Sequence, residues 1–399
     1  MCSKNFLLLF GMIVLLLSYI KIIDIINYSD SNLNEVNVKY KNNKYISSPL
    51  PMEHIVKIND ELLICAGLNY PKIFISKEYL TNPIKDGSLF LFNMKNNEFK
   101  PLIIENFPKG VRFHPHGLSL YKDNSDKYYL FIVNHSIKAN PEDNEERIEK
   151  VSLEINRHNI NLSFKNSYSL PKNYFGTLNS IAVIDLNTLY FTTHSYFPLP
   201  SFSEDDSSDN YLIKIKYQIF DKLDKLFKIL NIKKTYLYSY NLDERKINLI
   251  SNSEGLSNHG LAYNPDKSLL YMARPFEKDI KIYEISRHFP TKALLINTIK
   301  TIYNVRNIFY DIYNEKIYAG IYGSNKELTN LDKSYIQFGS FNNITSFGGF
   351  EEIDVKNDYE ITELILMKDK VKGVSSGIKV NNKIYLSSPY QNELFIYQQ

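Results

Sequence analysis

The sequence contains no tryptophan and only two cysteines among its 399 residues. Cys2 precedes an apolar N-terminal run and Cys65 lies in the body of the chain, so we expect no disulfide bridge between them. The chain therefore lacks the disulfide framework on which small secreted domains depend. A chain of this length has to rely on a large apolar core, to which 31 tyrosines and 24 phenylalanines contribute.

A strong net charge of either sign is also missing. Lysine and arginine number 47 and aspartate and glutamate 44, which leaves a formal net charge of +3. Such a balance indicates no electrostatic attraction to nucleic acid or to acidic substrates. We therefore expect no nucleic-acid partner.

A long hydrophobic run occurs at the extreme N-terminus. Residues 6–26 are apolar apart from Ser18, Lys21 and Asp24, and about 20 such residues can span a bilayer. We expect residues 1–26 to form an uncleaved signal anchor, with the body of the chain in the lumen of the secretory pathway or outside the cell. The alternative is a buried core helix.

Polar segments accompany this expected anchor. Residues 27–50 are rich in asparagine, serine and lysine and are predicted to be a linker. The Asn-x-Ser/Thr sequons at Asn161 and Asn343 are compatible with a glycoprotein.

One pattern recurs from Glu53 to the C-terminus. A short β run, a turn, a second β run, a polar loop and an aromatic-rich strand follow one another, and the pattern occurs six times. Turns such as NPDK and NNK are typical of β-hairpins. The repetition predicts an all-β fold, a six-bladed β-propeller over residues 51–399. A pair of β-sandwiches is the alternative, but it does not require six copies.

In a propeller, the innermost strand of each unit begins or ends at a central tunnel. The starts of the six units share polar side chains, and we expect these to line the tunnel: Glu53 and His54, His116, Asn179, Asn258 and His259, Asn307, and Ser375 and Ser376.

The segment 211–234 departs from this pattern. Leucines and isoleucines recur at helical spacing, and Ser208 and Asp209 offer an N-cap, so we expect an inserted helix over about 209–234. Lysines outnumber aspartates on it, which is typical of helices that bind membrane surfaces. The alternative is an ordinary helix packed on the propeller.

Two histidines in the segment Arg112–Ser136 are candidates for chemistry. His116 lies between Pro115 and Gly117, which we expect to hold it on a bend, and His135 ends an apolar strand. Two imidazoles on neighbouring strand ends can act as a general base and its relay. Alternatively, both are rim histidines that bond only to the backbone.

The same segment carries a resemblance to a known family. Pro115-His116-Gly117-Leu118, an apolar strand and then Val133-Asn134-His135 resemble the paraoxonase/arylesterase family, and weaker similarity continues to the C-terminus. The resemblance implies a six-bladed propeller with two calcium ions, which hydrolyses lactones and aryl esters at membrane or lipoprotein surfaces. The disulfide that joins the two ends of the chain in that family is not expected in this chain, because Tyr397 stands at the position of the C-terminal cysteine.

The resemblance also implies a set of metal ligands. Glu53, Asn179 and Asn307 match the family's ligands, with the Leu118 carbonyl for the second ion, and His259 stands where the family has an asparagine. At other positions an acidic residue of the family is replaced, by Arg306, Ser180, His54 and His194. A site with fewer carboxylate oxygens favours Ca²⁺ less strongly, and the added histidine nitrogens make Zn²⁺ an alternative.

Two functions follow from the resemblance. In the first, His116 takes a proton from water, His135 relays it, and a cation, either a metal ion or Arg306, polarises the carbonyl of a lactone or aryl ester. In the second, the propeller is catalytically inactive and binds a small ligand or a protein at the membrane surface. In either case we expect the N-terminus and the helix 211–234 to contact the membrane surface.

Overall fold

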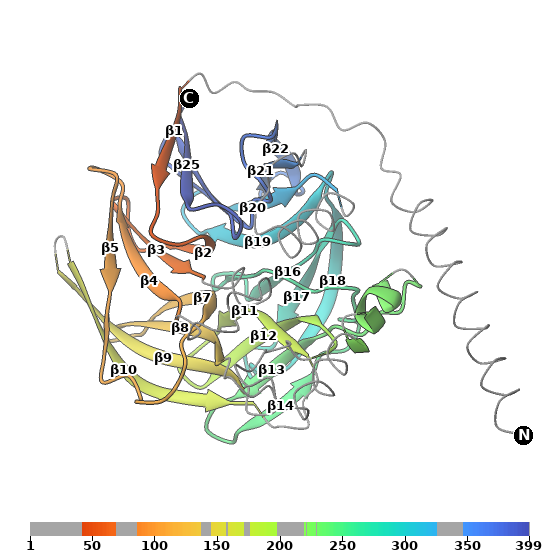
Figure 1. Ribbon diagram of the computed structural model, residues 1–399. Coiled ribbons are helices and arrows are strands. Elements are labelled where there is room, and N and C mark those ends of the chain that lie inside the picture. Colours follow the sequence, from red (N-terminus) through yellow and green to blue (C-terminus); the bar gives the residue numbers. More distant parts are fainter. Residues whose placement is uncertain are drawn as a thin grey trace, which may run out of the picture.

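The chain folds almost entirely into antiparallel β-sheets. The computed structural model describes residues 42–68, 86–136, 145–156, 159–170, 176–197, 219–220, 222–228, 230–324 and 346–398. Six sheets are arranged in sequence order around a common centre, which confirms the predicted six-bladed β-propeller (Figure 1). Each sheet is one blade, and its innermost strand contacts the innermost strands of the two neighbouring blades. The innermost strands are β2, β7, β11, β15, β19 and β23.

Blades 1 to 3 are formed by the strands between residues 52 and 249. Blade 1 consists, from the inside outward, of β2 (Met52–Lys57), β3 (Leu62–Gly67), β4 (Ser88–Asn93) and β5 (Glu98–Leu102). Blade 2 has five strands, β7 (Pro115–Lys122), β8 (Tyr128–Ser136), β9 (Glu145–Asn156), β10 (Asn159–Ser169) and β6 (Ile104–Glu105). Blade 3 consists of β11 (Thr177–Val183), β12 (Thr188–Ser195), β13 (Leu237–Asn241) and β14 (Lys246–Leu249).

The remaining blades follow the same order. Blade 4 consists of β15 (Leu261–Asn264), β16 (Leu269–Arg274), β17 (Asp279–Ile285) and β18 (Ala293–Lys300). Blade 5 consists of β19 (Asn304–Asp311), β20 (Lys316–Tyr322), β21 (Phe347–Asp354) and β22 (Glu360–Lys368). Blade 6 consists of β23 (Ser376–Val380), β24 (Lys383–Ser387), β25 (Glu393–Gln398) and β1 (Asn42–Ser47).

The ring is closed by the pairing of its two ends. Strand β1 runs antiparallel to β25, with Asn43 opposite Tyr397, and Tyr45 meets Phe395 edge to face with ring centroids 5.0 Å apart. Backbone hydrogen bonds thus join the two ends, and Cys65 is a buried free thiol. The linker expected over residues 27–50 does not extend to residue 50, because residues 42–47 complete blade 6. Residues 42–47 can be mostly polar because an outer strand buries little of its surface. The sequence therefore has no apolar pattern that would predict this strand.

Asparagine and aspartate side chains shape the hairpin turns. Asn93 Oδ1, Asp185 Oδ1 and Asp311 Oδ1 each accept a hydrogen bond from the backbone two residues on, at 2.9, 2.8 and 3.0 Å. Such short side chains stabilise tight turns by replacing a backbone acceptor. Their recurrence explains why turns such as NPDK predict the hairpins correctly.

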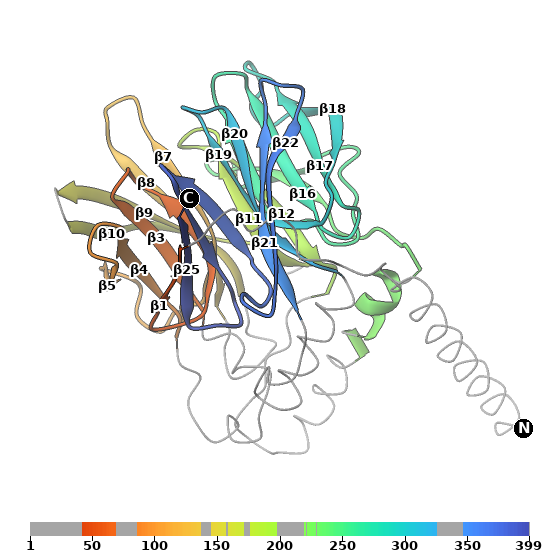
Figure 2. The same cartoon turned by 90° about the horizontal axis from the view of Figure 1, so that it is seen from above.

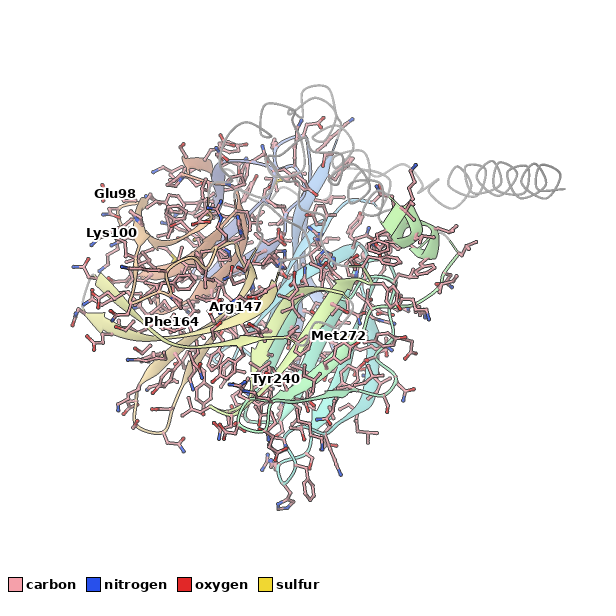
Figure 3. All side chains as sticks on the ribbon, turned by 60° about the horizontal axis from the view of Figure 1, so that its bottom comes forward. Glu98, Lys100, Arg147, Phe164, Tyr240 and Met272 are labelled. Carbon is pink, nitrogen blue, oxygen red and sulfur yellow. The ribbon has the colours of Figure 1, made fainter. Side chains whose placement is uncertain are left out.

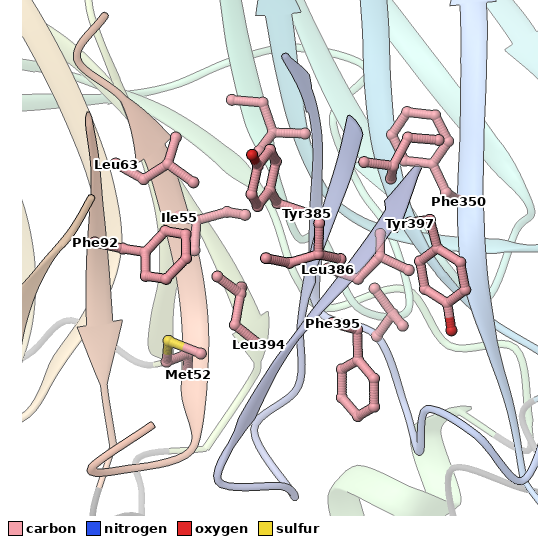
Figure 4. Packing of buried hydrophobic residues seen from close by; sticks show 14 of the residues in the cluster. Met52, Ile55, Leu63, Phe92, Phe350, Tyr385, Leu386, Leu394, Phe395 and Tyr397 are labelled. Atoms are coloured by element: carbon pink, nitrogen blue, oxygen red, sulfur yellow. The ribbon is translucent and has the colours of Figure 1, made fainter. Parts of the chain in front are cut away.

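Apolar side chains fill the spaces between adjacent blades. Met52, Ile55 and Phe92 of blade 1 face Leu394 and Tyr385 of blade 6 (Figure 4), and all five are fully or almost fully buried. Tyr240 of blade 3 and Met272 of blade 4 belong to two further clusters of this kind (Figure 3). Burying one such side chain contributes about 1.5–3 kcal/mol relative to leaving it exposed.

A short helical segment lies outside the blades. Residues 219–220 and 222–228 are helical and lie at one face of the ring (Figure 2, green). The helix ends before the expected residue 234, because Asn231 adopts a left-handed φ of 56° and the Ile232 amide bonds to the Phe227 carbonyl at 2.7 Å. This arrangement is a common C-terminal helix cap.

The described part of this helix packs on the propeller. Phe220 and Phe227 stack on Phe197, with ring centroids 4.6 and 6.0 Å apart, while Ile219 remains half exposed. Within the described ranges, no helix is both long and apolar enough to cross a membrane. The expected anchor at residues 1–26 lies outside these ranges.

Candidate functional site

Polar side chains meet at the centre of the ring, where the innermost strands begin. Five of the residues singled out in the sequence are buried there, and we call them the central cluster: Glu53, His116, Asn179, His259 and Asn307. The structure brings them together from five blades, although their chemical roles remain predictions.

Irregular strand pairing turns these side chains toward the centre. The register of four innermost strands shifts near the polar residue: between Met52 and His54, Pro115 and Leu118, Leu178 and Ile181, and Val305 and Ile308. A bulge of this kind bends a strand and re-aims its side chains. In these four blades the common position of the polar residue therefore matches a common local distortion.

Glycines after two of the histidines allow neighbouring blades to approach closely. A Cβ atom on Gly117 would lie 2.4 Å from the Asn179 carbonyl oxygen, and one on Gly260 would lie 2.5 Å from the Arg306 carbonyl oxygen. Gly117 therefore serves close packing inside strand β7. The φ of Gly117 is not positive, so the bend at His116 comes from the register shift between Pro115 and Leu118 and not from a left-handed glycine.

His116 is positioned as a neutral imidazole. Its Nδ1 lies 2.9 Å from the Asn179 carbonyl oxygen, which can only accept, so Nδ1 carries the proton and Nε2 holds the lone pair. Burial, and next the nearby His135 and His194, hold the pKa of His116 well below its usual value of 6.5. Its Nε2 lies 3.8 Å from Glu53 Oε1. A neutral ring in this tautomer can accept a proton at Nε2.

Glu53 is the buried carboxylate of the cluster. It accepts hydrogen bonds from the Ser375 hydroxyl and from Asn307 Nδ2, the latter at 3.3 Å. Burial raises its pKa, and the charge of Arg306 and these two hydrogen bonds partly oppose that rise. Glu53 thus links three blades through one side chain.

His135 is held by a carboxylate that sequence reasoning missed. Its Nδ1 donates to both oxygens of Glu146, at 3.0 and 2.8 Å, and its ring centroid lies 4.9 Å from that of His116. Glu146 Oε2 also accepts the Leu178 amide at 3.0 Å, one residue before Asn179. Glu146 stands directly opposite His135 in the β8–β9 register, and only that register identifies it.

Ser375 belongs to a second motif that sequence reasoning missed. Gly373–Gly377 reads G-V-S-S-G, which matches the G-x-S-x-G pattern of serine hydrolases. In this chain the segment leads into strand β23 rather than into a helix, and the Ser375 hydroxyl is bonded to Glu53 and Asn307. This context indicates a structural serine rather than a nucleophile elbow.

Two further histidines continue the row of imidazoles. The rings of His116 and His194 are parallel with centroids 6.1 Å apart, and those of His194 and His259 are 5.7 Å apart. Burial lowers the pKa of His194 to about 3 and that of His259 well below its usual value. Two charged residues of the helical segment influence His194: Lys228 lowers its pKa and Asp224 raises it.

The oxygen atoms expected to bind calcium are only partly suited to it. Asn179 Oδ1 and Asn307 Oδ1 are buried and accept no hydrogen bond within the described ranges, which would suit a hard cation. Glu53, however, is the one carboxylate of the cluster, and the guanidinium of Arg306 lies near enough to lower its pKa. Six to eight oxygens are usual for calcium. The residues present do not fit a calcium ion.

His54 and His259, which the sequence resemblance also places among the metal-site positions, do not form a metal site with the described residues either. His54 Nδ1 accepts the Leu118 amide at 2.8 Å, and burial lowers the pKa of His54 to about 4, so this ring is neutral and structural. His259 lies in the row of imidazoles, but in the described part of the chain no three His, Cys, Asp or Glu side chains are grouped to hold a metal ion. A zinc site built on His259 is therefore not supported either.

Comparison with known proteins places the chain in a family. A family model described as Arylesterase matches residues 52–336, which span blades 1 to 4 and part of blade 5. This chain belongs to the arylesterase family. Because the match includes the segment with His116 and His135, it confirms the resemblance stated from the sequence.

The relatives of this arylesterase-family protein are distant. Serum paraoxonase/lactonase 3 of Oryctolagus cuniculus is 25% identical over 278 residues, covering 67% of this chain and 65% of the relative. Serum paraoxonase/arylesterase 1 of Homo sapiens is 25% identical over 274 residues, covering 66% of this chain and 63% of the relative. The chain thus matches slightly less than two thirds of the length of these relatives.

A solved structure supports the fold alone. The X-ray structure of a protein assigned as a gluconolactonase superposes with a TM-score of 0.50 and 9% sequence identity, covering 92% of this chain and 94% of that chain. At this identity the likeness concerns the fold and not the chemistry.

Proposed function

We propose that this arylesterase-family protein hydrolyses small lactones or aryl esters at the central cluster. One observation carries the proposal: His116 is buried as a neutral imidazole, with Nδ1 bonded to a carbonyl and Nε2 directed toward Glu53. The names of its relatives, paraoxonase/lactonase and paraoxonase/arylesterase, support the same class of substrate.

The reaction follows from the position of His116. Nε2 accepts a proton from water, and the water oxygen attacks the carbonyl carbon of the ester. The tetrahedral intermediate then expels the alcohol oxygen, which takes the proton back from His116, so that one water yields one acid and one alcohol. For a lactone both groups remain in a single hydroxy acid. A positive charge near the carbonyl oxygen stabilises the intermediate.

His135 supports this step from a position beside the His116 ring. Nδ1 of His116 is bonded to the Asn179 carbonyl and its Nε2 lies near Glu53, while the His135 ring contacts the His116 ring edge to face. We propose that Glu146 is a positioning residue for His135. The expected relay from His116 to His135 stays a prediction.

Glu146→Gln is expected to lower kcat for the best ester by about tenfold, with little change in KM. The substitution keeps the shape of the side chain but removes the charge, and a hydrogen bond to a charged group is worth about 1.5–3 kcal/mol. Steady-state kinetics checks this, with Glu146→Asp expected to restore part of kcat. Glu145→Gln is the control, because Glu145 pairs with Arg147 instead. An unchanged kcat in Glu146→Gln would remove the positioning role.

The pH profile of kcat/KM is expected to have its acid limb below pH 6.5, the usual pKa of histidine. The reaction needs neutral His116, and burial together with His135, His194 and Arg306 lowers its pKa. Activity should therefore persist as the pH falls through 6.5 and decline only well below it. Glu53 also faces His116, and its own raised pKa makes its protonation the competing cause of an acid limb. A limb at or above 6.5 would contradict the assignment of His116 as the base.

We also propose that residues 1–26 anchor the propeller to a membrane of the secretory pathway. The apolar run of the sequence supports this proposal, and the exposed Asn161 on strand β10 is accessible for glycosylation. Alkaline carbonate extraction of membranes from expressing cells tests the anchor, and release of the protein into the supernatant would contradict it.

A further inference from the structure

We propose that Arg306 takes the place of a divalent ion at the central cluster and makes this cluster a binding site for carboxylates. The proposal rests on the proposed function and deepens it, because hydrolysis of an ester or lactone releases a carboxylate at this point. It concerns binding, so it can be tested apart from turnover.

Arg306 occupies a central position in the ring. It precedes Asn307 in the irregular part of strand β19, and its guanidinium carbon lies 4.5 Å from the centroid of the Tyr322 ring, whose hydroxyl accepts one of its hydrogens. Stacking on an aromatic ring fixes the plane of a guanidinium, which then presents a rigid fork of donors.

The charge of Arg306 reaches groups from several blades. It lowers the pKa of Glu53 in blade 1, of His116 in blade 2, of His194 in blade 3 and of His259 beside blade 4. The Arg306 carbonyl accepts the Gly260 amide at 3.1 Å, and the adjacent Asn307 is bonded to Glu53, so Arg306 is located at the inner end of its blade. A planar guanidinium matches a carboxylate through two parallel hydrogen bonds.

The balance of charge at the cluster disfavours a divalent ion. Glu53 is its single carboxylate, and its hydrogen bonds to Ser375 and Asn307 already occupy the Oε1 atom. A divalent ion would add two positive charges beside a guanidinium in a buried site, where an excess of one charge is strongly unfavourable. A carboxylate ligand would instead neutralise Arg306.

Neutral hydrogen bonds hold the blades together where the resemblance implies acidic metal ligands. His54 of blade 1 accepts the Leu118 amide of blade 2 at 2.8 Å, and the Ser180 hydroxyl of blade 3 accepts the Leu261 amide of blade 4 at 3.1 Å. The Thr192 hydroxyl donates to the His259 carbonyl at 2.6 Å. The inner ring thus has direct contacts between blades that need no buried cation.

The experiment measures ligand binding by the full-length protein after treatment with chelator. Isothermal calorimetry and the melting temperature are recorded with calcium chloride and with sodium 4-hydroxybutanoate, against sodium chloride at equal ionic strength. The variants are Arg306→Gln, Arg306→Lys and Arg306→Asp, and Arg287→Gln is a matched control because Arg287 is exposed.

We expect the wild type and Arg287→Gln to bind 4-hydroxybutanoate and to show no calcium-dependent shift. Arg306→Gln should weaken carboxylate binding by about tenfold or more, since a charge-assisted hydrogen bond is worth about 1.5–3 kcal/mol. Arg306→Lys should retain part of the affinity. Arg306→Asp adds a second carboxylate, so we expect calcium to raise the melting temperature of this variant.

Stoichiometric calcium binding by the wild type would overturn the proposal, as would a carboxylate affinity that Arg306→Gln leaves unchanged. If Arg306→Asp does not fold, the Gln and Lys variants still decide between these outcomes. A protein that binds the carboxylate without calcium but hydrolyses no ester would refute the proposed function and leave this inference standing.

Discussion

His116→Gln is expected to lower kcat/KM for the best lactone or aryl ester by about 10²- to 10⁴-fold, the usual contribution of a general base. Glutamine can still donate to the Asn179 carbonyl, so the contact between blades 2 and 3 can survive while the proton acceptor is lost. Hydrolysis of a panel of lactones and aryl esters by the full-length protein is the measurement, together with the melting temperature of each variant.

His288→Gln is the matched control for this variant. His288 is exposed in the connection between strands β17 and β18, outside the central cluster, and its loss should leave the rate unchanged. Equal rates for wild type and His116→Gln, with both proteins folded, would show that hydrolysis does not use this imidazole. If no protein hydrolyses any member of the panel, the alternative of an inactive binding propeller gains support.

Asp279→Asn is expected to reduce the free energy of unfolding by about 3–5 kcal/mol, the usual cost of breaking a buried ion pair. Asp279 accepts two hydrogen bonds of 2.8 Å from Arg274, and both side chains are almost fully buried. The substitution removes the carboxylate that accepts both of these hydrogen bonds and leaves the buried guanidinium with the longer contact of 3.7 Å to Glu277 Oε1. Arg274 also donates to the Glu254 carbonyl at 3.0 Å, so the segment that leads to His259 should loosen as well.

Urea denaturation followed by circular dichroism measures this loss. The control is Asp60→Asn, since Asp60 pairs with Lys57 at 2.7 Å while its side chain is 72% exposed. Exposed ion pairs of this kind contribute about 0–1 kcal/mol. A loss in Asp279→Asn no larger than in Asp60→Asn would show that the buried pair does not stabilise blade 4.

Local sequence was sufficient to predict the architecture of the ring. Alternating apolar strands, turns begun by residues such as Asn264 and Asp311, and the sixfold recurrence of one unit all depend on neighbours in the chain. The positions of Glu53, His116 and Asn307 followed from the same periodicity. Each unit buries its faces against the next, so equivalent residues come to equivalent places.

Contacts between distant segments could not be predicted in this way. The pairing of β1 with β25 joins residues at opposite ends of the sequence, and the polar residues 42–47 carry no apolar pattern that would indicate it. Glu146 meets His135 only because of the β8–β9 register, which the spacing of the two residues in the chain does not specify. The end of the helix near Asn231 depends on a cap that the apolar spacing does not reveal.

The sequence by itself determined that this protein is an all-β ring of six units with polar residues at each inner end, because strand periodicity and turn chemistry are local properties. Only the tertiary structure decided what those residues do to one another. Burial at the centre of the ring lowers the pKa of His116 and raises that of Glu53, and side chains of other blades modify both values. The environment of a titratable group is set by what surrounds it in space, which the order of the residues alone does not specify.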